Sequence, residues 1–330
     1  MFASALPSAG KSWESSDPKT SDHRAPRILP MTTTAQPVPH FSRRTAFLLL
    51  AISGCLWGTG FPLGKVALVE IGVSHLILYR LLFACLGLAP FLSFRMVKIQ
   101  RKDWWMFLLT SFIGIPGVYI LQFWGLSKTT VSHAALMVGT LPLLLALAVV
   151  IFTHERLSRV AWIAVVFSAL GAVLIVWSSR TSMPRGGGPT LIGDLAVLLS
   201  LFAATGWIMN NKVLLRRYPP LFVTGSIYIL GTAMLAAWVL PLDGLPPVHL
   251  SHVVWLSLLV QGIAGTSLAT VLWNWGLARV PAAEAGVFTN FEPLVGTLLG
   301  VTVMGDRLGP LAIVGGVLIL GGAFYLSKAG

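Results

Sequence analysis

The chain has 330 residues, of which 55% are hydrophobic and only 10% are charged, whereas soluble domains contain about 25% charged residues. Together with a mean hydropathy of +0.82, this composition excludes an ordinary soluble enzyme, a disordered protein and a nucleic-acid binder. The net charge of +12 is therefore interpreted first against a membrane. Cys55 and Cys85 both lie in apolar stretches, which predicts small core residues rather than a disulfide or a metal site.

Residues 1–43 differ from the rest of the chain because they are rich in Ser, Thr, Pro and Ala and include Glu14, Asp17 and Asp22. This composition predicts a disordered polar tail. The tail lacks the apolar core of a signal peptide, and its acidic residues argue against a transit peptide. Met1 and Met31 both remain candidates for the start of translation.

The remainder of the chain contains ten apolar stretches, each close to the length of about 20 residues that a helix needs to cross the hydrocarbon of a bilayer. Because lipid offers the backbone no hydrogen-bond partners, these stretches must be helical. The predicted fold class is an all-α integral membrane protein with ten transmembrane helices. In chain order they cover about 45–67, 74–94, 104–126, 132–153, 160–178, 191–212, 219–240, 254–276, 282–304 and 309–327.

The basic residues predict the orientation of these helices. Most of the 23 Lys and Arg residues fall on one side when the tail is placed inside, in the tail itself and in alternate loops. Cytoplasmic loops carry such an excess. The sequence therefore predicts a multi-pass protein of the cell (inner) membrane with both termini cytoplasmic.

Two halves of the chain repeat at a fixed offset of 151 residues. Trp124-Gly125-Leu126 recurs as Trp275-Gly276-Leu277, and Glu155-Arg156-Leu157 recurs as Asp306-Arg307-Leu308. The predicted repeats cover 45–178 and 191–327, joined by a linker at 179–190. Since each holds five helices, the second must enter the membrane from the opposite side. Inverted repeats are typical of alternating-access transporters with a substrate site near the midplane.

No phosphate-binding loop accompanies these helices. Gly58 to Lys65 comes nearest, but it misses the spacing of that motif, and Val66 stands where a hydroxyl is required. The sequence therefore predicts a uniporter or an ion-coupled secondary transporter. We expect no catalytic residues, no cofactor and no metal site.

Two charged residues lie inside apolar segments, where a charge is costly unless it pairs, reaches water or has a function. Arg80 either anchors its helix or binds a substrate carboxylate or phosphate. Glu292 lies about mid-way through the ninth helix, where desolvation favours the protonated carboxyl. It is the candidate for ion coupling, and a helix-kink role is the alternative.

Polar, aromatic and helix-breaking residues complete the candidate site. The candidates for substrate binding beside Arg80 are Trp57, Tyr79, Trp207, Tyr228 and Asn290. The candidate helix hinges, for which close packing is the alternative role, are Gly58, Gly60, Pro62 and Pro293. His133 and Glu284 occupy equivalent positions of the two repeats, where we expect capping or interface roles.

The ordered set of motifs in ten helices resembles the EamA type of the drug/metabolite transporter superfamily. The matching features are Trp57-Gly58 with Pro62, Arg80, Pro142 with Glu155-Arg156-Leu157, Gly193-Asp194, and Glu292-Pro293 with Asp306-Arg307-Leu308. Asp306 departs from the Glu that is usual there. The resemblance implies an exporter of amino acids, small metabolites or drug-like compounds.

Two alternatives stay open at this stage. One is a nucleotide-sugar or organic-phosphate exchanger of the same superfamily. The other is a membrane-embedded enzyme, which would need a cluster of His, Asp or Cys at one membrane face. The predicted partners are a small-molecule substrate and the lipid bilayer, but not nucleic acid, with protons and a homodimer as further options.

Overall fold

The computed structural model describes residues 42–91, 98–153, 159–181 and 188–329. The predicted polar tail at 1–43 lies outside the described residues as far as residue 41, as do the turn at 154–158 and most of the linker. All ten predicted membrane segments are helical, so that prediction is confirmed. Seven of the described helices are long and apolar enough to cross a membrane by length and composition.

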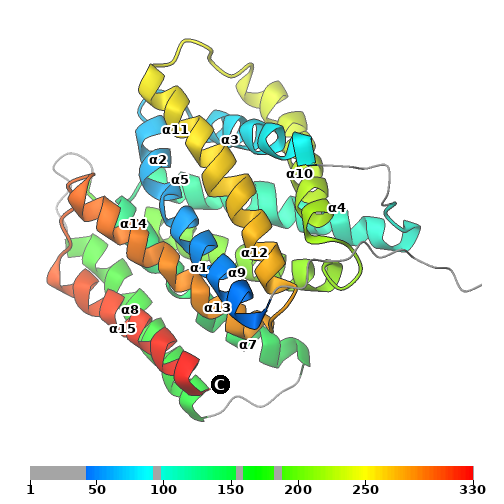
Figure 1. The fold of residues 1–330 in the computed structure, drawn as a ribbon. Helices are drawn as coiled ribbons and strands as arrows, with labels where there is room; N and C mark the ends of the chain where they lie inside the picture. The colour runs from blue at the N-terminus through cyan, green and yellow to red at the C-terminus, as the bar shows by residue number, and fades with distance from the viewer. Residues whose placement is uncertain (1–41, 92–97, 154–158, 182–187, 330) are drawn as a thin grey trace, which may run out of the picture. The chain divides into compact units, whose positions relative to one another are not determined.

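The described helices of each repeat form five spans, whose arrangement Figure 1 shows. The first repeat contains α1 (Arg43–Gly58), α2 (Gly60–Ala67), α3 (Val73–Leu88), α4 (Trp104–Phe112), η3 (Ile113–Ile120), α5 (Leu121–Ser127), α6 (Val131–Val138), α7 (Leu141–Thr153) and α8 (Arg159–Thr181). The second contains α9 (Leu191–Leu214), α10 (Pro220–Asp243), α11 (His252–Gly262), η4 (Ile263–Leu268), α12 (Ala269–Leu277), α13 (Ala282–Val287), η5 (Phe288–Asn290), α14 (Phe291–Thr302) and α15 (Pro310–Ala329).

Hydrogen bonds between loops show which ends of the spans lie together, and they define two opposite faces of the protein. The face that we call distal joins 68–72, 128–130, 188–190, 244–251 and 303–309. The face that we call terminal joins the start of α1 to 98–103, 215–219 and 278–284. The first repeat therefore starts on the terminal face and the second on the distal face, which confirms the predicted inversion.

The last helices of the two repeats, α8 and α15, lie side by side in Figure 1. A Cβ on Gly171 would lie 2.7 Å from the side chain of Ile319, and one on Gly315 would lie 2.8 Å from that of Ile175. The earlier part of one helix thus faces the later part of the other, so the pair is antiparallel. Equivalent helices pack in this way when their repeats are related by an axis in the membrane plane.

The Trp-Gly-Leu motif marks the places where the repeats interlock. Gly125 of α5 packs on α9, where a Cβ would lie 2.7 Å from the carbonyl oxygen of Gly193 and from Val197. Its equivalent, Gly276 of α12, packs on α1, where a Cβ would lie 2.5 Å from Leu50. Each repeat therefore presses its third span against the first span of the other, and glycine lets the backbones approach.

Three spans predicted as continuous helices are interrupted. The first breaks at Thr59, the fourth between Val138 and Leu141, and the ninth between α13 and α14. A proline lies in the first turn of each helix that follows a break, where its missing N–H costs no helical hydrogen bond. These prolines are Pro62, Pro142 and Pro293.

The third span of each repeat contains a π-helical segment at an equivalent place. In the first repeat η3 includes Pro116, and in the second η4 follows α11 directly. A π-helix inserts an extra residue into a turn and often marks a functional site. Both segments lie near the middle of their spans, Arg101–Ser127 and His252–Leu277.

The interlocking glycines give a test of the packing. We expect Gly125→Ala to lower the free energy of unfolding by about 1–3 kcal/mol, because its methyl group would meet the α9 backbone. The measurement is the thermal unfolding midpoint in detergent. Gly206→Ala is the matched control, since a Cβ there meets nothing within 4 Å. Equal midpoints for the two variants would contradict the close approach.

Candidate functional site

A cavity lies between the two repeats, lined by residues of α1, α2, α3, η3, α5, α6, α7, α9, α10 and α14. Its volume of about 70 Å³ is well below the roughly 300–1,000 Å³ of pockets that hold drug-sized ligands. The cavity is therefore too narrow in this conformation for a small metabolite, and a ligand larger than a few waters requires the surrounding helices to part.

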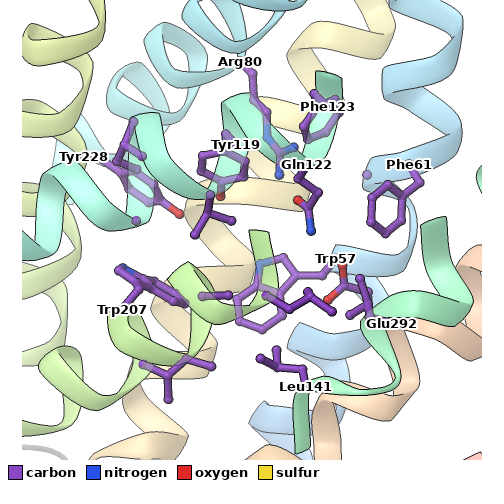
Figure 2. A pocket seen from close by; sticks show the side chains of 18 residues that line it. Trp57, Phe61, Arg80, Tyr119, Gln122, Phe123, Leu141, Trp207, Tyr228 and Glu292 are labelled. Atoms are coloured by element: carbon purple, nitrogen blue, oxygen red, sulfur yellow. The ribbon is translucent and has the colours of Figure 1, made fainter. Parts of the chain in front are cut away.

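Aromatic side chains form most of the wall (Figure 2). The ring centroids of Trp57 and Trp207 are 6.4 Å apart in an edge-on arrangement. Gly114 of η3 makes room for Trp207, because a Cβ there would lie 2.2 Å from the indole. The indole Nε1 of Trp207 is buried without a hydrogen-bond partner in the structure. It is a donor available to a bound ligand.

Arg80 enters the cavity from α3 and is only 4% exposed. Its Nε donates to the hydroxyl of Thr266 in η4 at 2.5 Å, and its Nη2 lies 3.4 Å from the carbonyl oxygen of Gly265. The guanidinium carbon lies 4.6 Å from the centroid of Tyr119 and 5.1 Å from that of Phe123. The π-helix thus anchors one edge of the guanidinium, while aromatic rings compensate part of its lost hydration.

Glu292 reaches the cavity from the first turn of α14. The sequence placed it mid-way through a helix, but the break after α13 puts it at a helix start instead. Its equivalent in the first repeat is Leu141, which lines the same cavity after the break in the fourth span. The two repeats therefore differ at this position, where one has an ionisable side chain and the other an apolar one.

Arg80 and Glu292 do not touch. Among the described residues neither forms an ion pair, although both line one cavity. In the view of Figure 2, Trp57 lies between Glu292 and Trp207, and Arg80 reaches in from another direction. A cation and an anion held apart in an aromatic cavity can bind the two ends of a small molecule that carries both charges.

Two of the candidate hinges serve as points of close approach. A Cβ on Gly58 would lie 2.7 Å from the Val295 side chain and 2.8 Å from the carbonyl oxygen of Glu292. Gly60 lies beside the guanidinium of Arg80, with both Nη atoms 3.9 Å from its Cβ position. The break at Thr59 therefore brings the first span close to both charged residues.

The structure does not bring Tyr79 or Asn290 to the cavity. Tyr79 is one helical step of about 100° from Arg80, so its hydroxyl points away and donates to the carbonyl oxygen of Pro247 at 3.0 Å. Its ring packs on Trp255, with centroids 5.0 Å apart. Asn290 ends η5, and its side-chain amide donates to the carbonyl oxygen of Val287 at 2.9 Å.

Other residues at the site were not predicted from the sequence. Phe61, Tyr119 and Phe123 line the cavity, and Thr266 anchors Arg80. Gln261, by contrast, is a polar residue in an apolar segment and so a candidate from the sequence, and its amide donates to the carbonyl oxygen of Gly60 at 2.6 Å. Gly114, Pro116 and Gly117 around Tyr119 are the one sequence signal of an irregular backbone there.

His133 and Glu284 hold equivalent positions near the start of the fourth span of each repeat, and each contacts an ionisable side chain. His133 Nδ1 lies 3.0 Å from Asp194 Oδ2, and both side chains are buried. Glu284 Oε2 lies 2.6 Å from Arg43 Nη2, where both are partly exposed. The partners Asp194 and Arg43 are themselves separated by 151 residues. The repeats therefore preserve the contact but change its charges.

Comparison with known proteins agrees with this architecture. The model of the EamA-like transporter family matches residues 44–177 and 191–328. An uncharacterized transporter of Archaeoglobus fulgidus is 24% identical over 285 residues, which are 86% of this chain and 96% of that protein. A probable terminal-alkyne amino-acid exporter of Streptantibioticus cattleyicolor is 26% identical over 289 residues, covering 84% of this chain and 92% of that protein.

A solved crystal structure has the same fold. It has a TM-score of 0.65 and 22% sequence identity, and the match covers 87% of this chain and 98% of that one. The family match spans both repeats, and transporters of this family are not enzymes. The chain belongs to the EamA-like transporter family and is a multi-pass membrane transporter of a small-molecule substrate.

Proposed function

We propose that this chain is a secondary transporter that exports a small zwitterionic metabolite, of the size and charge of an amino acid, by alternating access. The observation that carries the proposal is the unpaired Arg80 and Glu292 in one aromatic cavity between inverted repeats. A carboxylate of the substrate would bind the free edge of Arg80. An ammonium group would bind Glu292, and the apolar part would lie against Trp57 and Trp207.

The charge of the cavity favours this class over the exchange of organic phosphates or nucleotide sugars. Phosphate esters carry about two negative charges. Arg80 is the one cation among the described residues that line the cavity, and it shares the cavity with a carboxylate. The name of the relative in Streptantibioticus cattleyicolor, a probable terminal-alkyne amino-acid exporter, supports the same class.

Glu292 is also the proposed site of proton coupling. One carboxyl group that is accessible from the cavity can bind a proton or the substrate amine, but not both at once. Such competition links outward movement of substrate to inward movement of protons. Protons are therefore proposed partners, and a homodimer stays a further option.

The proposed orientation places the terminal face in the cytoplasm, with both ends of the chain there, because basic residues are concentrated on that face. The proposed domain limits remain 45–178 and 191–327, with a linker between them. A reporter fused after Gly330 should behave as cytoplasmic, which an impermeant protease applied to intact cells would check. Digestion of the fused reporter in intact cells would reverse the orientation.

Substrate chemistry is the first functional test. Purified protein in proteoliposomes should exchange labelled neutral amino acids, and unlabelled amino acids should compete. The matching methyl esters, N-acetyl derivatives and decarboxylated amines should compete at least about thirtyfold more weakly, because each leaves one buried charge unpaired. Competition by organic phosphates instead of amino acids would overturn the proposed class in favour of the phosphate exchanger.

Arg80 gives the second test. Arg80→Gln should weaken the binding of the exchanged amino acid at least about thirtyfold, since truncating one partner of a buried charge pair costs about 2 kcal/mol or more. Arg80→Lys should bind the amino acid more tightly than Arg80→Gln but more weakly than the parent, because lysine keeps the charge but lacks the planar guanidinium group. Tyr79→Phe is the neighbouring control, and its binding should be unchanged. An equal loss of binding in Tyr79→Phe and Arg80→Gln would exclude a specific contact between the amino acid and Arg80.

Glu292 gives the third test. In Glu292→Gln, a pH gradient should no longer drive uptake into proteoliposomes, while exchange without a gradient continues at a measurable rate. Glu70→Gln is the matched control, because Glu70 is an exposed loop carboxylate. Hydrogen bonds from the side chain and the backbone N–H of Ser251 lower the pKa of Glu70, so it is ionised at neutral pH. Gradient-driven uptake that survives in Glu292→Gln would refute the coupling role.

A further inference from the structure

Two lysines at the ends of the first spans make the same contact in the two repeats. Lys65 Nζ donates to the carbonyl oxygens of Leu126 and Thr129, at 2.9 and 2.7 Å. Lys212 Nζ donates to the carbonyl oxygens of Leu277 and Val280. The acceptors of the two lysines are again separated by 151 residues. Because the repeats are inverted, one contact lies at the distal face and the other at the terminal face.

Each contact ties the first span of a repeat to the end of its own third span. The last carbonyl groups of a helix have no helical partner and carry partial negative charge, so a cation that bonds to two of them is favoured. Both lysines are half-buried. Asp306, in the loop after α14, attracts Lys65, while Lys212 is repelled by Arg216 and attracted less strongly by Glu284.

The tied helices are the ones that close the cavity. Phe61 lies one turn before Lys65, lines the cavity and stacks on Phe123 with centroids 6.4 Å apart. Phe123 in turn lies one turn before Leu126. Lys65 thus holds in place both helices that carry this aromatic pair over the distal side of the cavity.

The terminal side has the corresponding arrangement. Ile208 lies one turn before Lys212 and lines the cavity. Trp273 lies one turn before Leu277, and its ring centroid is 5.0 Å from that of Trp57, another residue of the cavity wall. The cavity is therefore bounded towards each face by two helices that a lysine ties together.

The two faces differ in how tightly they are sealed. At the distal face the side chains of His133 and Asp194 are 2% and 0% exposed. At the terminal face the equivalent pair, Glu284 and Arg43, is 38% and 67% exposed. The equivalent contact is thus buried at the distal face and partly exposed at the terminal face, although both lysine contacts are made.

We propose that Lys65 and Lys212 are positioning residues that act as opposite latches of the transport cycle, each holding its own face closed until the other face has closed. The inference rests on the proposed alternating access. In the occluded conformation both latches are engaged, as they are here. Opening the distal face breaks the contact of Lys65, and opening the terminal face breaks that of Lys212.

The test uses one reporter cysteine on each face. Val131 and Ala282 are the equivalent first residues of α6 and α13, and are 1% and 9% exposed in this closed conformation. Val131→Cys and Ala282→Cys are introduced separately after Cys55 and Cys85 have been replaced by alanine. Labelling by an impermeant maleimide is then measured from both sides of proteoliposomes, with and without saturating amino acid.

Lys65→Met should raise the labelling rate of the distal reporter relative to the terminal one by roughly threefold or more, because a charge-assisted hydrogen bond is lost from one state only. Lys212→Met should shift the ratio in the opposite direction. The double variant, Lys65→Met with Lys212→Met, should have a ratio of distal to terminal labelling rates close to that of the parent. Lys65→Arg should keep the parent ratio. Changes of the same sign at both reporters would mean that the lysines only stabilise the fold, which would overturn the inference.

Failure of the latch and failure of alternating access give different results. If amino acid shifts the two reporters in opposite directions in the parent but neither methionine variant does so, the latch inference is wrong and alternating access survives. If no condition shifts the reporters in opposite directions, alternating access fails as well. Should a methionine variant be lost from the membrane, Lys65→Gln and Lys212→Gln keep a polar side chain and give the same readout.

Discussion

Inside a bilayer the backbone must satisfy its own hydrogen bonds, because lipid supplies neither donors nor acceptors. A break in a spanning helix is therefore tolerated only where protein or a water-accessible cavity meets the freed groups. Beside the break at Thr59, protein supplies such a polar group, since the amide of Gln261 donates to the carbonyl oxygen of Gly60. The three breaks and the two π-helical segments lie in spans that line or bound the cavity, so the polar backbone surface of the protein is concentrated where a substrate could use it.

Inverted duplication explains why the same packing contacts occur in both repeats. Residues that occur in only one repeat are the ones that distinguish the two halves. Contacts that maintain the architecture occur twice, as at Gly125 and Gly276. Charge does not follow the repeat in the same way, since Glu292 has Leu141 as its counterpart. Packing contacts are thus shared by the two halves, whereas Glu292 gives one half a carboxyl group that the other half lacks at the equivalent position.

The fold could be predicted from the sequence because its signals extend over long stretches of chain. Ten apolar segments and a motif repeated at an offset of 151 residues do not depend on local detail. The rotation of each helix about its axis could not be predicted from the sequence, because an apolar helix that is buried on several sides has no polar face. Tyr79 and Arg80 show the consequence, since these adjacent residues face a loop and the cavity, respectively.

The π-helical segments and the break before Glu292 depend on packing between distant spans. Lys65 and Lys212 were missed because a lysine at the end of a span is indistinguishable in sequence from a loop charge.

The hydrogen bonds around Arg80 offer a physical route from the cavity to the distal face. Arg80 donates to Thr266, the hydroxyl of Thr266 donates to the carbonyl oxygen of Gln261 at 2.7 Å, and the amide of Gln261 donates to Gly60. Gly60 is the first residue of α2, the short helix that also carries Phe61 and Lys65. A ligand that draws the guanidinium of Arg80 into the cavity would therefore pull on the start of the helix whose end is tied at the distal face. The connection is short and passes through three side chains, and the break at Thr59 leaves α2 free to move without bending α1. In this arrangement the charge that would recognise the substrate and the lysine that ties the distal face belong to one mechanical unit.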